Sequence, residues 1–288
     1  MTQSQEMVRP AFDPAHTAFS EIRRVEVDGQ VLRVARRRAD VALGVPLLIF
    51  NGIGANLELL EPFVEALRGI EIIAFDAPGV GASPSTIVPY RYRHLAHLAD
   101  RLMKELGYDS KIDVLGVSWG GGLAQQYAFL YPDRCRRLIL AAASTGAIMV
   151  PGRLSALRRL ANPRRYYDRS YLKRVAPEIY GGPQHRAPNL IDHHVQHVRP
   201  PDGLGYLYQL LAISGWTSLP WLHRLRQPTL IMAGTEDPLV PPLNARILKY
   251  LIPGAQLIFF DDGHLFLTTS AHEVAPVVRQ FLISTNTK

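Results

Sequence analysis

Short apolar runs alternate with longer amphipathic segments along most of the chain. The short runs have the length and continuous hydrophobicity of strands buried on both faces of a sheet. They are residues 46–50, 71–75, 112–115, 137–143, 229–233 and 256–260. The longer segments have a helical period of apolar residues and cover 59–67, 92–106, 121–130, 242–250 and 273–282. This alternation predicts an α/β fold with a mostly parallel sheet and helices on both of its faces.

The N-terminal region has a different pattern. Residues 1–20 are polar, contain two prolines and lack the apolar block of a signal peptide, so we expect a flexible N-terminal arm. Segments 21–27 and 31–37 alternate between apolar and polar residues around Asp28-Gly29, a pair typical of tight turns between antiparallel strands. We therefore expect the folded part to open with a β-hairpin.

The regular alternation stops between residues 147 and 223. Short helical patterns with many aromatic residues fill this region, and strand patterns resume directly after it. We expect a helical cap, or lid, over 147–223, inserted into a core formed by 21–146 and 224–288. Residues 203–222 are uncharged, but glycines and a proline interrupt them, which argues against a transmembrane segment.

The net charge of +7 is concentrated in one region. Residues 151–200 hold ten Arg or Lys and three acids, so they account for the whole excess. The pattern is compatible with a solvated helical face, or with a basic surface that meets an anionic partner such as a coated particle. No nucleic-acid-binding module is present. The single cysteine, Cys135, excludes an internal disulfide and fits a cytoplasmic location.

Ser118 is the strongest candidate for chemistry. It lies in Gly116-Val117-Ser118-Trp119-Gly120, a G-x-S-x-G sequence between an apolar run and a helical pattern. This arrangement is typical of the nucleophile elbow, a tight strand-to-helix turn that lifts a serine hydroxyl above the end of a sheet. An ordinary strand-to-helix turn could match the same motif, so further residues are needed.

A serine nucleophile needs a base, and the base needs an orienting carboxylate, in the chain order serine, acid, histidine. Asp237 follows the run 229–233 and is the preferred acid, with Glu236 as its nearest competitor. His264 comes directly after the last predicted strand and is the candidate base. Asp261 and Asp262 precede it and are expected to shape its loop.

Acyl chemistry also needs backbone N–H groups that stabilise a developing oxyanion. We expect these donors to be Trp119, directly after the nucleophile, and Ile53, in the glycine-containing loop after residues 46–50. The loop 76–83 is also rich in glycine, but it lacks the pattern of a phosphate-binding loop. His193 and His197 are spaced i, i+4 without the remaining features of a zinc site, so no metal is expected.

The chain resembles the intracellular medium-chain-length polyhydroxyalkanoate depolymerases of the α/β-hydrolase superfamily. The resemblance extends over about residues 20–284, including the cap, and is carried by 51–59, 116–126, 147–152, 180–182, 215–218 and 261–267. It implies the same triad of Ser118, Asp237 and His264. The serine distinguishes the chain from polyhydroxyalkanoate synthases, which carry cysteine there, and from dehalogenases and epoxide hydrolases, which carry aspartate.

The resemblance implies hydrolysis of ester bonds in a water-insoluble polyester, without a cofactor, to 3-hydroxy acids or oligomers. Asn51, Gly52, Trp216 and Leu265 are expected to bind the substrate, and the uncharged stretches 138–152 and 203–222 could line an apolar cleft. The polymer granule surface is the expected partner. A small-molecule carboxylesterase or a carbon–carbon bond hydrolase would use the same triad, and a non-catalytic binding protein of this fold is a further alternative.

Overall fold

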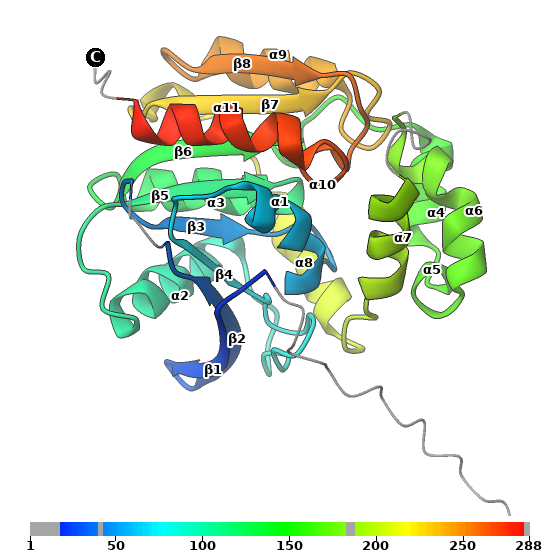
Figure 1. The fold of residues 1–288 in the computed structure, drawn as a ribbon, viewed down its shortest axis with the longest axis horizontal. Helices are drawn as coiled ribbons and strands as arrows, with labels where there is room; N and C mark the ends of the chain where they lie inside the picture. The colour runs from blue at the N-terminus through cyan, green and yellow to red at the C-terminus, as the bar shows by residue number, and fades with distance from the viewer. Residues whose placement is uncertain (1–17, 40–42, 183–187, 285–288) are drawn as a thin grey trace, which may run out of the picture.

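The computed structural model describes residues 18–39, 43–182 and 188–284. Eight strands form one sheet in the order β1-β2-β4-β3-β5-β6-β7-β8 (Figure 1). Within this sheet, β1 pairs antiparallel with β2 and β2 pairs antiparallel with β4, whereas the other neighbouring strands are parallel. The strands are β1 Glu21–Val27, β2 Gln30–Arg37, β3 Leu47–Phe50, β4 Ile72–Phe75, β5 Ile112–Val117, β6 Cys135–Ala141, β7 Thr229–Gly234 and β8 Gln256–Phe260.

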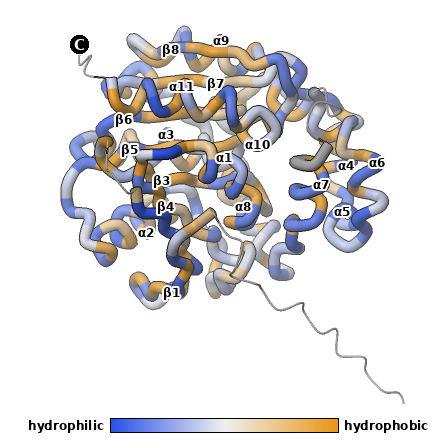
Figure 2. Tube along the Cα trace, in the orientation of Figure 1, coloured by the Kyte–Doolittle hydropathy of each residue, from blue (hydrophilic) through white to orange (hydrophobic). Residues whose placement is uncertain are grey.

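Helices cover both faces of this sheet. Short 3-10 helices precede α1 and β7, at η2 Leu57–Leu60 and η4 Leu222–Arg224. The helices of the layers are α1 Glu61–Ala66, α2 Tyr92–Glu105, α3 Trp119–Leu130, α9 Pro242–Leu251, α10 Phe266–Thr269 and α11 Ala271–Ile283. Side chains alternate across β3: Leu48 joins the cluster under α2, α3 and α9, and Ile49 joins the one under α1 and α11. The central strands β3 and β7 are correspondingly apolar, whereas β1 and β2 also carry charged residues (Figure 2).

The predicted α/β architecture is confirmed, and the differences are local. Asp28 and Gly29 both have positive φ, as expected for the tight turn of the hairpin. The pattern at 59–67 divides into η2 and α1, with Pro62 in the first turn of α1, where a missing N–H breaks no helical bond. The sequence pattern does not predict α10, because a four-residue helix is too short to establish a period.

Between β6 and β7 lie α4 Leu154–Ala161, α5 Arg164–Tyr167, α6 Arg169–Tyr180, α7 Pro188–His197 and α8 Gly205–Ile213. Helices α4 to α7 stand together beyond one end of the strands (Figure 1). Buried residues of α4, α6 and α7, including Leu172, Ile179 and Val195, form an apolar cluster of their own. Within the described ranges, no helix is both long enough and apolar enough to cross a membrane.

Two residues predicted to belong to the N-terminal arm are attached to the sheet domain. Phe19 is buried in the cluster under α1 and α11. The Ser20 hydroxyl donates to the Arg36 carbonyl at 3.0 Å and accepts from the Arg38 N–H at 3.1 Å. The rest of the predicted arm, through residue 17, lies outside the described residues.

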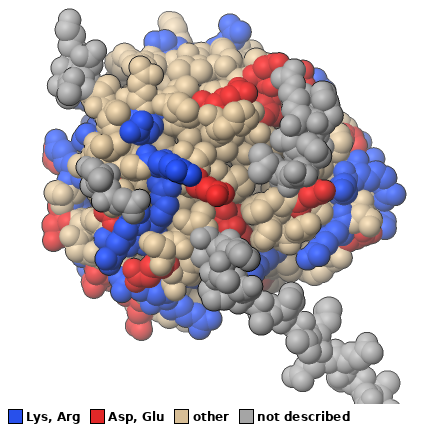
Figure 3. All heavy atoms as spheres, in the orientation of Figure 1, with Lys and Arg blue, Asp and Glu red and all other residues tan. Residues whose placement is uncertain are grey.

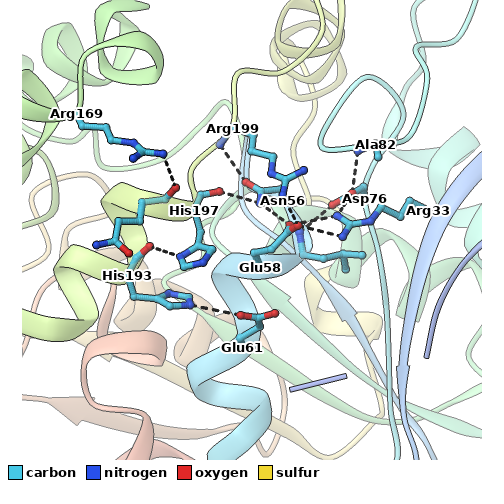
Figure 4. A network of polar contacts seen from close by, with 12 residues as sticks. Arg33, Asn56, Glu58, Glu61, Asp76, Ala82, Arg169, His193, His197 and Arg199 are labelled. Carbon is cyan, nitrogen blue, oxygen red and sulfur yellow. Dashed lines mark hydrogen bonds and ion pairs between the residues drawn. The ribbon is translucent and has the colours of Figure 1, made fainter. Parts of the chain in front are cut away.

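A buried polar network ties the inserted helices to the sheet domain (Figure 4). Arg33 on β2 forms ion pairs with Glu58 at 3.0 Å and Asp76 at 3.1 Å. Glu58 also pairs with Arg199 at 3.1 Å, and Asn56 donates to Glu58 at 2.6 Å. Burial opposes ionisation of Glu58, but hydrogen bonds from Arg33 and Asn56 outweigh it and lower its pKa.

The same network reaches the end of α7. The side-chain N–H of Asn56 donates to the carbonyl of His197 at 3.0 Å, and its oxygen accepts from the N–H of Arg199 at 3.3 Å. Asn51 in turn donates to the Asn56 carbonyl at 2.9 Å. Asn51 begins the loop after β3. The network therefore positions this loop relative to the sheet and to the end of α7.

Candidate active site

Ser118 occupies a strained turn between β5 and α3. Its backbone has φ 53° and ψ −116°, a conformation that side chains larger than glycine rarely adopt. The turn is held by bonds from the Ser118 N–H to the Ala141 carbonyl and from the Gly121 N–H to the Ser118 carbonyl, both 2.8 Å. A Cβ at Gly116 or Gly120 would collide with neighbouring backbone, which explains both motif glycines.

Ser118, His264 and Asp237 form a continuous chain of hydrogen bonds. His264 Nδ1 lies 2.6 Å from Asp237 Oδ2, and His264 Nε2 lies 3.0 Å from Ser118 Oγ. A carboxylate can only accept, so Nδ1 carries the imidazole proton and Nε2 is free to accept from the serine hydroxyl. The structure therefore brings together three residues that are separated by up to 146 positions in sequence.

The carboxylate of Asp237 is fixed in orientation. Its Oδ1 accepts from the backbone N–H groups of Leu239 and Val240, each at 2.8 Å, which leaves Oδ2 directed at His264. The residue is only 4% exposed. Glu236, the competing acid, is exposed, so the geometry favours Asp237.

The loop that carries His264 is held from two sides. The His264 N–H donates to the carbonyl of Tyr180, the last residue of α6, at 2.7 Å. Asp262 accepts from the Gly263 N–H at 2.6 Å and from the hydroxyls of Thr269 at 2.6 Å and Ser270 at 2.7 Å. Asp262 thus shapes the loop, as expected, and α6 contributes directly to the position of the base.

The proposed oxyanion donors lie on the two sides of Ser118. Trp119 is the first residue of α3, so its N–H has no acceptor one turn earlier within the helix. Ile53 lies in the loop after β3, which approaches so closely that a Cβ on Gly52 would stand 3.7 Å from the Ser118 Cβ. Asn51 accepts from the Gly52 N–H at 2.9 Å and stabilises this loop from within.

A cavity of about 370 Å³ opens onto Ser118 and His264. Its walls are mainly apolar and come from both uncharged stretches, through residues such as Met149 and Ile213. Asn51, Gly52, Ile53, Trp216 and Leu265 all line it. The indole N–H of Trp216 donates to Gln126 at 2.8 Å, which fixes the ring in the wall. The side chain of Asn51, by contrast, is engaged in hydrogen bonds within its own loop.

Comparison with known proteins agrees with this arrangement. Residues 45–271 match the family model described as the alpha/beta hydrolase fold. The chain belongs to the α/β-hydrolase family. Among curated relatives, it is 52% identical over 261 residues to a poly(3-hydroxyalkanoate) depolymerase from Ectopseudomonas oleovorans, with 90% of this chain and 92% of the relative covered. The resemblance to polyhydroxyalkanoate depolymerases is therefore confirmed.

More distant relatives share the same architecture. Lipase 1 from Psychrobacter immobilis is 25% identical, over 83% of this chain and 77% of the lipase. The solved structure of an enol-lactonase from Burkholderia xenovorans LB400 superposes with a TM-score of 0.77. It is 22% identical and covers 91% of this chain and all of the lactonase, so it supports the fold alone.

Gln209 is a residue of this hydrolase site that the sequence analysis did not single out. Its side-chain oxygen accepts from the Gly54 N–H at 2.7 Å, and its carbonyl accepts from the Trp119 indole at 2.9 Å. Gln209 thereby connects α8 to Trp119 and to the loop of Ile53, the two residues predicted to donate to the oxyanion. The available signal was its position, as a lone amide in the middle of an uncharged apolar stretch.

Three further polar side chains of the cavity wall come from α5, α6 and α7. Arg165, Tyr180 and His194 are buried and line the cavity. The charge pattern of residues 151–200 predicts a solvated basic face or surface, and for Arg165 this prediction is wrong. Other basic residues of this region, such as Arg158 and Arg164, are exposed, and blue side chains gather over α5 and α6 (Figure 3).

The two histidines spaced i, i+4 on α7 contact each other and Glu61. The rings of His193 and His197 stack at 4.0 Å, and His197 Nδ1 bonds to the His193 carbonyl at 2.8 Å. His193 Nε2 lies 3.4 Å from Glu61. Within the residues that the structure describes, no group of three potential ligands has the geometry to hold a metal.

His194 should make the stability of the protein depend on pH. Burial, then the nearby positive charge of Arg165, lowers its pKa from 6.5 to about 3. Between these values the unfolded chain binds a proton that the folded chain does not, so stability falls as pH falls. We expect this residue alone to cost about 2 kcal/mol between pH 7 and pH 5.

Urea unfolding of the wild type and of His194→Gln at both pH values tests this effect. The variant should lose about 2 kcal/mol less on acidification than the wild type. His272→Gln, at an exposed histidine, measures the effect of the substitution itself. Equal acid destabilisation of the wild type and His194→Gln would contradict the assignment.

Proposed function

We propose that the protein is a serine hydrolase that cleaves the ester bonds of poly(3-hydroxyalkanoate). The proposal rests on the hydrogen bonds that join Ser118, His264 and Asp237 next to an apolar cavity. The 52% identity to a poly(3-hydroxyalkanoate) depolymerase supports the choice of substrate. The products are 3-hydroxy acids or their oligomers.

In the acylation step, His264 accepts the hydroxyl proton of Ser118 as the oxygen attacks the ester carbonyl. Asp237 keeps the imidazole in the required tautomer and stabilises its positive charge. The N–H groups of Trp119 and Ile53 stabilise the tetrahedral oxyanion, aided by the positive end of α3. As the ester C–O bond breaks, His264 returns the proton to the departing alcohol.

In the deacylation step, His264 removes a proton from water, which attacks the carbonyl of the acyl-enzyme. The same two N–H groups stabilise the second oxyanion. Collapse of the intermediate releases the acid, and the proton returns to Ser118. The residues thus complete a hydrolytic cycle with no group beyond the chain itself, the ester and water.

The cavity wall fits an aliphatic polyester. Leu160, Leu210, Ile213 and Leu265 are among the residues around it, and they would contact the alkyl side chains of a medium-chain polymer. We propose that residues 147–223 act as the cap over this cavity. The same triad would also serve a small-ester hydrolase, so the comparison of polymer with soluble ester is decisive.

The exposed face of α8 supports action at the surface of a polymer granule, for which we propose a cytoplasmic setting. Leu204, Leu207 and Leu211 are 47%, 48% and 38% exposed and follow one another at i, i+3 and i+7. Ile87 and Val88 are even more exposed, and Ile87 lies near α8, since the Tyr208 hydroxyl donates to the Ile87 carbonyl at 3.4 Å. The leucine row continues into the cavity wall through Leu210.

The proposal predicts that the protein clears a suspension of amorphous medium-chain poly(3-hydroxyalkanoate). Ser118→Ala should abolish clearing, with a fall in rate on the order of 10⁴-fold or more, because the nucleophile is absent. Turbidity is the measurement. Nitrophenyl octanoate and a short-chain polymer serve as comparison substrates. Hydrolysis of the soluble ester without clearing of either polymer would assign the protein to the small-ester hydrolases.

The leucine row predicts a separate effect on the insoluble substrate. Leu207→Gln should slow polymer clearing by about fivefold, since a half-exposed leucine no longer adsorbs to the apolar surface. Hydrolysis of nitrophenyl octanoate should stay unchanged. Leu243→Gln, at an exposed leucine of α9, is the matched control. Equal clearing by the two variants would argue against adsorption through α8.

A further inference from the structure

Arg165 is a buried cation in the wall of the cavity. The residue is only 4% exposed, although it stands in an otherwise exposed basic segment. Its guanidinium lies over the ring of Tyr166 at 4.1 Å and near that of Tyr206 at 5.8 Å. One Nη donates to the Tyr166 hydroxyl, and Tyr180 also interacts with the charge.

This charge has no carboxylate partner in the part of the chain that the structure describes. Among the described residues, no carboxylate forms an ion pair with Arg165, and its Nε has no hydrogen-bond partner. Burial raises the pKa of Tyr166 and Tyr180, so their hydroxyls remain protonated and supply no negative charge. A buried guanidinium normally has an anionic partner, because desolvation without one is costly.

The arginine is close to the catalytic groups. A Cβ on Gly54, next to the oxyanion residue Ile53, would collide with the Tyr166 hydroxyl and approach Tyr206 to 3.4 Å. Tyr180 holds the His264 loop through its carbonyl. Arg165 and its tyrosine neighbours therefore connect the loop of Gly54 with the loop of His264. Arg165 and Tyr180 themselves line the cavity that the substrate would enter.

We propose that Arg165 binds the free carboxylate at the end of a 3-hydroxyalkanoate chain or soluble oligomer. This inference rests on the proposed function and extends it to the choice of ester bond. The guanidinium carries two Nη groups, and charge-assisted hydrogen bonds from them would hold a carboxylate in the cavity that Arg165 lines.

The direction of the polyester chain determines which fragment is bound to Ser118 and which fragment is released. The carboxyl end belongs to the alcohol side of every ester in the chain, so Ser118 acquires the remaining acyl part. As the C–O bond breaks, the departing hydroxyl takes its proton from His264, and the released fragment keeps the carboxylate bound at Arg165. The site therefore favours trimming from the carboxyl end, and its acid product should compete with substrate.

The decisive experiment compares two soluble substrates that differ only in charge. They are the linear dimer of 3-hydroxyoctanoate as the free acid and its methyl ester, assayed at the internal ester bond. The wild type should show a kcat/KM at least about tenfold higher on the acid, as expected for a charge-assisted contact. In Arg165→Met this ratio should fall to about one, with the rate on the methyl ester within about threefold of the wild type.

Arg158→Met is the matched control, because Arg158 is an exposed arginine of the same region. It should keep the wild-type ratio. Serine labelling by a fluorophosphonate and the melting temperature report whether each variant remains folded. Binding of 3-hydroxyoctanoate to the Ser118→Ala protein gives a readout without turnover, and Arg165→Met in that background should weaken it by about tenfold or more.

A wild-type ratio near one would overturn the proposal, whatever the variants do. An equal loss on both substrates in a folded Arg165→Met would also overturn it, because that result assigns Arg165 a structural role. Failure of the proposed function looks different. In that case the wild type cleaves neither dimer, although the binding of 3-hydroxyoctanoate can still be measured.

Discussion

The close approach of backbone segments around Ser118 is the constraint on which the site depends. A serine at φ 53° costs on the order of 1–3 kcal/mol, and the surrounding structure must hold it there. The bonds to Ala141 and Gly121, and the absence of side chains at Gly116 and Gly120, make that possible. The same turn starts α3, so one strained residue positions both the proposed nucleophile and the N–H of Trp119, a proposed oxyanion donor.

The inserted helices also support the residues proposed to act in catalysis. Tyr180 at the end of α6 supports the His264 loop, and Gln209 on α8 supports the loops of Ile53 and Trp119. The ion pair between Arg33 on β2 and Glu58 in η2 then connects the segment that follows the Ile53 loop to the sheet. Proposed base, nucleophile and oxyanion donors are consequently held by contacts that cross between the two parts of the chain.

The fold and the positions of the triad residues could be predicted from sequence, because a residue that directly follows a parallel strand lies at a known edge of the sheet. Ser118, Asp237 and His264 each follow a separate apolar run, and the carboxyl ends of parallel strands meet at one edge. The fold prediction succeeded for the same reason. The sequence also predicts the two segments proposed to hold the oxyanion donors, since one is adjacent to Ser118 and the other follows β3.

The polar residues of the inserted helices could not be predicted in this way. Arg165 belongs to a run of similar arginines, and nothing local distinguishes it from exposed Arg164. It is buried only because α5 packs against Gly54 and the tyrosines of two other helices. His194 and Gln209 likewise acquire their partners from segments far away in sequence. Hydrophobic periodicity and short motifs describe residues that are neighbours in sequence. The surroundings of Arg165, His194 and Gln209 arise instead from packing between segments that are distant in sequence.

The most direct test of the account is to trap the acyl-enzyme. The protein is mixed with an activated 3-hydroxyoctanoate ester, quenched with acid within one turnover, digested and analysed by mass spectrometry. The account predicts a 3-hydroxyoctanoyl group on the peptide that contains Ser118, absent from Ser118→Ala. An acyl group on another residue, or hydrolysis by the Ser118→Ala protein at the wild-type rate, would contradict it.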